Sequence, residues 1–417
     1  MRPAWLRWIA FGVFVTSSTL NYLDRQLLST LAPLLMAEMH FHQTGFGLLI
    51  SAFSVTYAAS SLVAGWFLDR AGVNRGISTA VSWWSLAAIS TGLVKSLPGL
   101  VACRAALGAG ESAGVPAVGK VNAMYLHPAE RALGTAANQI GLSVGTAAAS
   151  LGVLAAVAYG WRAPFLFTGF LGLLWIPVWL AVQRAIPPGQ QAEEPANRRS
   201  EWSILRDRPL VLTVVANVLW MGGYSLWSSW TTLYLTHVHH VTLKQSAAYV
   251  WIPPLVSNAG GFFGGWLSWR WIKREISPIA ARRRAVWVSA AGALLTLALP
   301  FAPDARWATA LISVSFFFLL SGSVNIYAIP LDLYGAAQSG LAVSALTCAF
   351  GVLQTVISPI IGFLADRNLY TEVLWLVTAP LFLSALVLMG VDHTGRRVAV
   401  VRDYISPESS RSDPPPA

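Results

Sequence analysis

Stretches of about 20 apolar residues recur twelve times along this 417-residue chain and constrain its fold more than any other feature. A helix of that length crosses the hydrocarbon core of a bilayer and satisfies its own backbone there. Only 11% of the residues are charged, whereas a soluble domain carries roughly 25%. The segments lie at approximately 8–34, 44–68, 77–96, 98–125, 132–158, 163–184, 209–235, 246–268, 284–302, 306–329, 340–364 and 371–391. We therefore expect an all-α membrane protein with twelve transmembrane helices.

One long polar stretch, residues 185–208, divides these segments into six and six. It is rich in proline, glycine and charge, which is typical of a linker. The sequence predicts an N-terminal six-helix bundle over 1–184 and a C-terminal one over 209–391, with a cytoplasmic, disordered tail over 392–417. Two such halves related by a two-fold axis along the membrane normal are one known plan of membrane transporters.

The basic residues predict the orientation of the chain. Of 28 Lys and Arg, twenty fall in loops on the side of the N-terminus and five on the other side. Basic loops stay on the cytoplasmic side, so both termini are expected in the cytoplasm. The remaining three, Arg25, Arg104 and Lys120, lie inside apolar segments, and Lys120 is close enough to a helix end to reach the interface. This distribution explains the net charge of +10 through anionic lipid, without nucleic acid.

Four charged residues lie deep in apolar segments: Asp24, Arg25, Arg104 and Glu111. Each costs at least ~3 kcal/mol near a bilayer centre, so such residues face a protein interior or a cavity. Arg104 and Glu111 are seven residues apart, which places them on one helix face about 10 Å apart. Asp24 is turned by about 100° from Arg25 and is free to face another partner. We expect the four charges to form one site.

The chemistry of this set favours an organic anion and a proton. The four charges sum to zero, and protonating both carboxylates leaves two positive charges. Arginine suits bidentate recognition of a carboxylate and does not lose its proton. An alternative is that the four residues only form two structural salt bridges between the first and fourth helices.

Several motifs resemble those of a known family. The motifs are Asn21-Tyr22-Leu23-Asp24-Arg25, the run from Arg104 to Pro116 with its glycines, Gly65-Trp66-Phe67-Leu68-Asp69-Arg70-Ala71-Gly72, and Trp230 to Leu235. Together they resemble the major facilitator superfamily and, within it, the anion:cation symporter family. Bacterial members of that family include sugar-acid and hexuronate transporters. The resemblance implies a multi-pass protein of the bacterial cytoplasmic (inner) membrane that works as a monomer.

The resemblance also implies roles for the charged residues. Arg25 would hold the substrate carboxylate, with Tyr22 beside it. Asp24 and Glu111 would be the protonatable pair, and Arg104 would be their switching partner and a substrate-site residue. One residue departs from the sugar-acid pattern, because Leu142 stands where such members often carry glutamine.

The loop after the second helix is expected to gate the protein. By resemblance, Gly65 would allow close helix packing, and Asp69 would bridge to Arg70 or cap a helix start in the second half, which would latch the cytoplasmic side. A similar run, Gly362 to Arg367, falls on the outer side in this topology and is interpreted as a chance likeness.

The second half carries no charge at mid-membrane in this interpretation. Its candidate substrate contacts are neutral: Tyr224, Asn325 and Gln354. Its histidines lie in outer loops without the convergent spacing of a metal site, so we expect no metal and no cofactor apart from the proton.

We expect a secondary active transporter that couples uptake of an organic anion to protons by alternating access. The anion would be a sugar acid such as a hexuronate or aldonate, or another carboxylate. The alternative is an organic-anion exchanger on the same fold without proton coupling. An enzyme is not expected, because the chain has no HExxH, GxSxG or CxxC motif.

Overall fold

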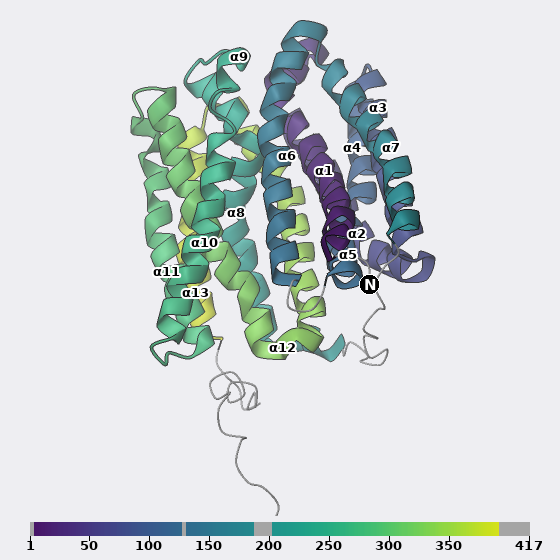
Figure 1. Cartoon of the computed structure of the whole chain (residues 1–417). Helices are drawn as coiled ribbons and strands as arrows, with labels where there is room; N and C mark the ends of the chain where they lie inside the picture. The colour runs from purple at the N-terminus through teal and green to yellow at the C-terminus, as the bar shows by residue number, and fades with distance from the viewer. Residues whose placement is uncertain (1–3, 127–130, 187–201, 392–417) are drawn as a thin grey trace, which may run out of the picture.

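The computed structural model describes residues 4–126, 131–186 and 202–391, and every regular element in these ranges is a helix (Figure 1). The first half contains α1 (Ala4–Met39), α2 (Gln43–Ala71), α3 (Val73–Leu93), α4 (Leu97–Glu111), α5 (Gly114–Tyr125), α6 (Arg131–Tyr159) and α7 (Arg162–Ala185). The second half contains η2 (Trp202–Arg206), α8 (Arg208–Val238), α9 (Leu243–Ser246), α10 (Ile252–Ile272), α11 (Pro278–Ala293), η3 (Leu294–Phe301), α12 (Ala305–Asp366) and α13 (Tyr370–Met389). The predicted all-α membrane fold is confirmed.

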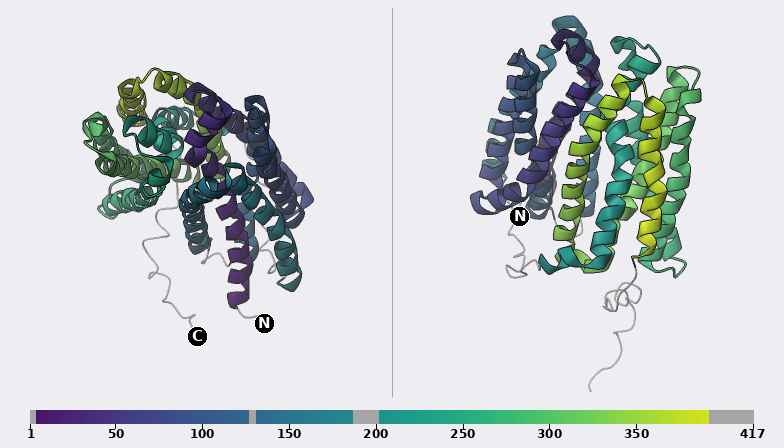
Figure 2. Two further views of the ribbon diagram at one scale, coloured as in Figure 1. Left: turned by 90° about the horizontal axis from the view of Figure 1, so that it is seen from above. Right: turned by 180° about the vertical axis from the view of Figure 1, so that it is seen from behind.

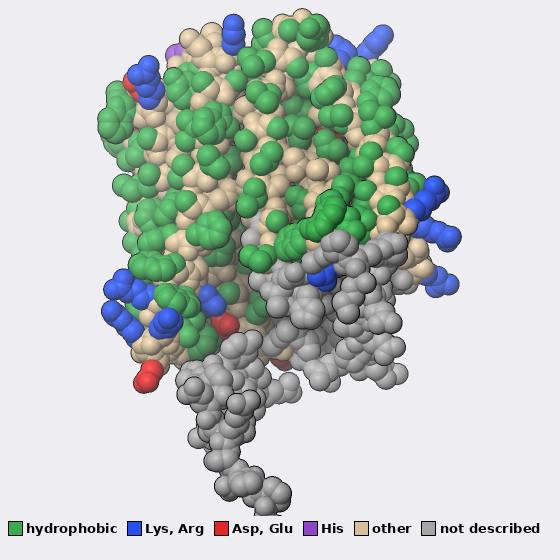
Figure 3. All heavy atoms as spheres, viewed as in Figure 1, with side chains coloured by type: hydrophobic (Ala, Val, Ile, Leu, Met, Phe, Trp, Pro, Cys, Tyr) green, Lys and Arg blue, Asp and Glu red, His purple; other side chains and the backbone are tan. Residues whose placement is uncertain are grey.

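The outside of the helix assembly is apolar. Seven of the described helical stretches are long and apolar enough to cross a membrane. Many large apolar side chains are exposed, and in the view of Figure 3 they cover the flanks while Lys and Arg gather toward the ends. This pattern matches a bilayer around the middle and water at both ends.

The two groups of helices lie side by side in Figure 1, the first half in purple to blue and the second in green to yellow. We call the end at which α1 begins the N-terminal face and the opposite end the distal face. The predicted tail at 392–417 lies outside the described residues, as does most of the predicted linker at 185–208. The described end of that linker includes η2.

The tenth and eleventh predicted segments belong to one helical element. The 62 residues of α12 would extend about 93 Å if straight, three times the roughly 30 Å hydrocarbon core. Its ribbon instead turns at the N-terminal face (Figure 1), and the stretches Ala305–Tyr334 and Leu341–Asp366 are the two membrane spans.

The fourth predicted segment is broken in the middle. Two turn residues, Ser112 and Ala113, separate α4 from α5, although the backbone angles of both stay in the right-handed helical region. Pro116 has no backbone N–H to donate to the carbonyl of Ser112, and it disfavours a helical residue before it. The break places Glu111 at the last position of α4, in the interior of the first half.

The two halves are in contact at the distal face. There α2 begins and runs along the second half of α12 (Figure 2). Both oxygens of the Asp366 carboxylate accept hydrogen bonds from the start of α2: Gln43 N–H at 2.7 Å and Thr44 N–H at 2.9 Å, with the Thr44 hydroxyl at 2.6 Å. A Cβ on Gly362 would lie 2.4 Å from the Gln43 carbonyl oxygen, so only glycine permits this approach.

Asp366 therefore caps a helix of the other half. The first backbone N–H groups of a helix have no partner within it, and the helix dipole favours a negative charge there. The run Gly362–Arg367 lies at the distal face, as the topology predicts, and there it fastens the two halves together through Asp366 and Gly362.

Candidate functional site

The polar stripe of α1 faces the centre of the molecule. Tyr22, Arg25 and Ser29 are spaced three and four residues apart, and all three line a cavity between the halves. Asp24 points elsewhere, as its helical angle predicts: it is 1% exposed and lies beside Thr168 of α7. Its Oδ1 has no hydrogen-bond partner among the described residues.

The two charged residues of α4 lie on one face of that helix and are both buried. Gly108 between them brings α4 against α2, since a Cβ there would lie 2.3 Å from the carbonyl oxygen of Phe53. This contact positions Arg104 next to the aromatic side chains of α2. Arg104 lines the cavity between the halves, and Glu111 lines a second cavity within the first half.

Arg25 and Glu111 form a buried ion pair. Arg25 donates from Nε at 3.1 Å and from Nη2 at 2.9 Å, both to Glu111 Oε2. The other carboxylate oxygen, Oε1, has no hydrogen-bond partner among the described residues. The alternative interpretation expected two salt bridges between the first and fourth predicted helices, and this ion pair is one of them.

The second salt bridge, between Asp24 and Arg104, is not formed. Arg104 is 3% exposed, and within the described chain no carboxylate pairs with it and its Nε donates no hydrogen bond. Burying a cation without an anion costs free energy. The unpaired charge of Arg104 therefore points to an anionic partner that the described chain does not supply.

Aromatic rings surround the two guanidinium groups. The Phe53 ring centre lies 4.9 Å from Cζ of Arg25 and 4.7 Å from Cζ of Arg104. Tyr22 and Tyr57 also lie against Arg25, at 4.9 and 5.0 Å. A ring face carries negative potential and attracts a cation, so Phe53 lies where it can stabilise both positive charges. Sequence analysis missed Phe53, because an aromatic residue in an apolar helix is more often a packing residue.

The central cavity has a volume of about 520 Å³ and lies between the halves. The first half contributes Tyr22, Arg25, Gln26, Ser29, Phe53 and Arg104 to its wall, among others. The second half contributes Tyr224, Ser228, Ser229, Phe350 and Gln354. One wall is thus cationic and aromatic, and the other offers hydroxyl and amide groups.

Two of the three predicted residues of the second half reach this cavity. Tyr224 lines it and packs edge-on against Phe316 and Phe350, with ring centres 5.3 and 5.8 Å away. The Gln354 side-chain oxygen accepts a 3.0 Å hydrogen bond from Ser54 of the first half.

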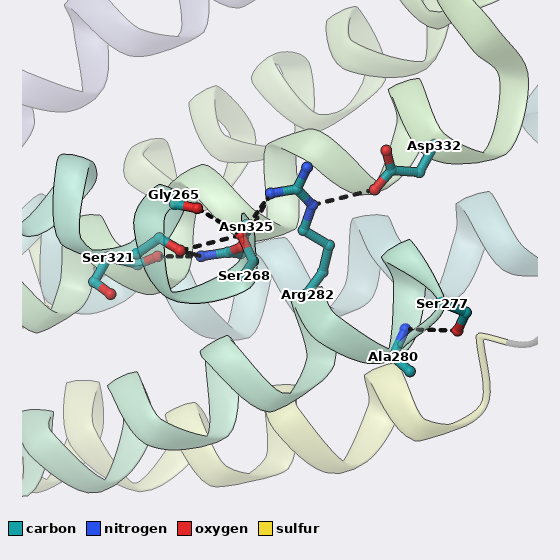
Figure 4. Close-up of polar contacts among 9 residues, drawn as sticks. Gly265, Ser268, Ser277, Ala280, Arg282, Ser321, Asn325 and Asp332 are labelled. Atoms are coloured by element: carbon teal, nitrogen blue, oxygen red, sulfur yellow. Dashed lines mark hydrogen bonds and ion pairs between the residues drawn. The ribbon is translucent and has the colours of Figure 1, made fainter. Parts of the chain in front are cut away.

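The structure does not bring Asn325 to the cavity. Its amide donates to the carbonyl oxygens of Gly264 and Ser321, so it holds α10 against α12 (Figure 4). Its oxygen faces Arg282, which donates to Ser268 at 2.7 Å and to Asp332 at 3.2 Å. The acidic group of this polar cluster, Asp332, comes from α12.

The predicted loop-motif residues lie at the end of α2 on the N-terminal face. Arg70 is exposed in the last turn of the helix. Gly65 and Asp69 belong to the same helix, but their side chains lie outside the described part of the structure. Among the described residues, no three His, Cys, Asp or Glu side chains converge as metal ligands.

A multi-pass helical membrane protein with two halves around a central charged cavity belongs to the class of membrane transporters, not enzymes. Residues 14–331 match the family model of the Major Facilitator Superfamily, and the chain belongs to this family.

Known proteins are similar over most of the chain. A probable sulfoacetate transporter of Cupriavidus necator is 29% identical over 95% of this chain and 97% of its own length. A galacturonate transporter of Dickeya chrysanthemi is 29% identical over 70% of this chain and 89% of its own. The hexuronate transporter of Escherichia coli strain K12 is 24% identical over 99% of this chain and 98% of its own.

A solved structure shares the fold. It is the inward-facing, unoccupied crystal structure of a bacterial homologue of the human lysosomal transporter Spinster, with a TM-score of 0.73 and 18% identity. The match covers 93% of this chain and 95% of that one.

Proposed function

We propose that this protein is a secondary active transporter that carries an organic anion together with protons by alternating access. The observation that supports this most is Arg104, a buried cation on the wall of the central cavity with no acidic partner among the described residues. An anion entering the cavity supplies the missing negative charge, and arginine binds a carboxylate through two parallel hydrogen bonds.

The proposed substrate is a sugar acid such as a hexuronate or aldonate, or another small carboxylate. The names of the similar hexuronate, galacturonate and sulfoacetate transporters support this class. The cavity supports it too, because hydroxyl and amide groups of Tyr224, Ser228 and Gln354 face the arginines. These neutral groups suit the oxygen-bearing end of an anion whose carboxylate meets Arg25 and Arg104.

Asp24 and Glu111 are the proposed proton carriers. Each is buried and has a carboxylate oxygen with no hydrogen-bond partner in the described structure. Protonation of Glu111 removes the charge that holds Arg25, which leaves Arg25 available to the anion. Binding of the proton and of the anion therefore favour each other, as linkage requires of a symporter.

The proposed location is the cytoplasmic membrane of a bacterium, with both termini in the cytoplasm. The topology predicted from the sequence assigns twenty of the 28 Lys and Arg to the side of the N-terminus, which supports this orientation. Both walls of the cavity come from a single chain, which suits a monomer.

Transport into proteoliposomes tests this function. Galacturonate, galactonate and sulfoacetate are added separately, with an inward proton gradient or with internal anion and no gradient. Symport predicts that the gradient drives one of these anions above its equilibrium level. The exchanger is supported instead if only internal anion accelerates uptake, and both are refuted if none of the three enters faster than into empty liposomes.

A further inference from the structure

A second cavity, of about 540 Å³, lies within the first half. Its wall comes from α1 to α6, and Tyr22, Arg25 and Glu111 form one end of it. From there it extends toward the N-terminal face. Ile77 on its wall lies only four residues into α3, which is about 6 Å from the start of that helix.

The cavity wall is mostly apolar, but four of its residues each have a buried polar atom that no described group satisfies. Two are donors, Asn21 Nδ2 and Trp84 Nε1, and two are acceptors, Asn138 Oδ1 and Glu111 Oε1. The four residues are between 1% and 6% exposed. Leaving such a group unsatisfied costs about 1–3 kcal/mol.

Water satisfies this combination, because each molecule both donates and accepts. Buried polar atoms of this kind are normally met by ordered water that makes about three hydrogen bonds. The cavity accommodates several water molecules, since each needs only about 10–15 Å³ of the space that the centre of a water-sized sphere can occupy.

We propose that the cavity holds a chain of water molecules through which protons move between the N-terminal face and Glu111. A proton passes along the hydrogen-bonded waters and binds to Oε1, forming an O–H bond, while the last water returns to neutral. Arg25 keeps its own proton and loses its anionic partner. The reverse steps release the proton to the same face.

This pathway is separate from the route of the anion. Tyr22 and Arg25 line both cavities, so the Arg25–Glu111 pair forms the wall between them. The proton moves on one side of the pair, and the anion binds on the other. Asn21, Trp84 and Asn138 are then positioning residues of the water chain. The inference rests on the proposed proton coupling.

Hydration is tested first, without transport. Cys103 and Cys348, the only cysteines of the chain, are replaced by alanine. Single cysteines are then introduced at Ala117, on the cavity wall, and at Leu174, which is exposed on the membrane-facing side of α7. Each variant in proteoliposomes is treated with a small charged methanethiosulfonate reagent. Ala117→Cys should react at least ~10-fold faster than Leu174→Cys, because the thiolate forms only where water reaches.

Equal rates at the two positions would refute a hydrated cavity. Complete protection of Ala117→Cys by galacturonate or sulfoacetate would also refute the proposal, because it would show that the cavity is part of the anion site and not a separate water chain. Reaction that is insensitive to both anions supports the water chain.

The pathway is tested with Asn138→Leu and Trp84→Phe, which remove the unsatisfied atoms and keep a branched and an aromatic side chain at the two positions. Proton-driven uptake of the anion should fall at least ~10-fold, while exchange of internal for external anion stays within twofold, because exchange needs no net proton movement. Asn217→Leu is the matched control, a buried asparagine of the second half that also has an unsatisfied oxygen but lies outside this cavity.

Unchanged proton-driven uptake in both variants would refute the pathway. An equal loss of uptake and exchange would also refute it, because that pattern describes a substrate contact. If the unmodified protein shows exchange but no response to a proton gradient, the proton coupling itself fails, and the hydration result stands independently of it.

Discussion

Arg25 donates both of its short hydrogen bonds, 3.1 and 2.9 Å long, to the same oxygen of Glu111, and the second oxygen is left without a partner in the described structure. The pair is thus a strong ion pair with one open acceptor. Such a geometry holds Arg25 in place and still leaves the carboxylate able to accept a proton.

Replacing Arg25 by alanine should abolish anion binding and destabilise the protein. Removing one partner of a buried pair costs about 3–5 kcal/mol, because the other charge is left uncompensated. The double variant Arg25→Ala/Glu111→Gln should regain thermal stability but not binding. Thermal unfolding in detergent and equilibrium binding measure the two effects. A double variant as unstable as the single one would contradict the role of this pair.

Asp24→Asn should separate exchange from proton-driven accumulation. Asp24 is buried next to α7 and forms no ion pair with a described residue, so its neutral form resembles the amide in shape and charge. Anion exchange should persist, and accumulation against a gradient should be lost. Asp304→Asn, a change of an exposed carboxylate at the start of α12, is the control. Concentrative uptake by Asp24→Asn would show that this residue does not carry the proton.

Phe53→Leu should weaken anion binding although Phe53 bears no charge. The ring lies within 5 Å of the Cζ atoms of both Arg25 and Arg104, and each cation–π contact is worth about 0.5–2 kcal/mol. Loss of about 1 kcal/mol corresponds to roughly fivefold weaker binding. Phe53→Tyr keeps the ring face and should bind nearly as well as the unmodified protein. Equal weakening in the two variants would assign Phe53 to packing alone.

Asp366→Asn should favour opening of the distal face. The carboxylate caps α2 from the other half, and such caps are worth about 1 kcal/mol. Spin labels at Lys95 and Arg306, which are exposed at the distal ends of the two halves, report the separation by double electron–electron resonance. A larger population of long distances is expected in the variant. An unchanged distance distribution would mean that the cap does not hold this face closed.

The sequence predicted the parts of the site that depend on helix geometry. Arg104 and Glu111 share a face because seven residues complete nearly two turns, and Asp24 points away from Arg25 for the same reason. The twelve apolar segments followed from the thickness of a bilayer.

The sequence could not predict which side chains from different helices meet. Nothing in the pattern decides that Arg25 pairs with Glu111 while Arg104 has no acidic partner among the described residues, because helix periodicity does not fix how α1 packs against α4. The position of Asn325 depends on the approach of α10 to α12, where its amide satisfies two carbonyl groups. The cap formed by Asp366 joins residues more than 320 positions apart, which no local signal reveals.

The central claim is that the anion supplies the charge that Arg104 lacks. The direct measurement is the equilibrium dissociation constant for galacturonate and for sulfoacetate with the unmodified protein and with Arg104→Gln, together with the ligand-free melting temperature of each. Losing a charged partner of the ligand costs about 2–5 kcal/mol, so the constant should rise about 30-fold or more. The ligand-free melting temperature should stay equal or increase, because an uncompensated buried cation has been removed. Binding of equal strength in the variant, or a ligand-free melting temperature as low as that of Arg25→Ala, would contradict the claim.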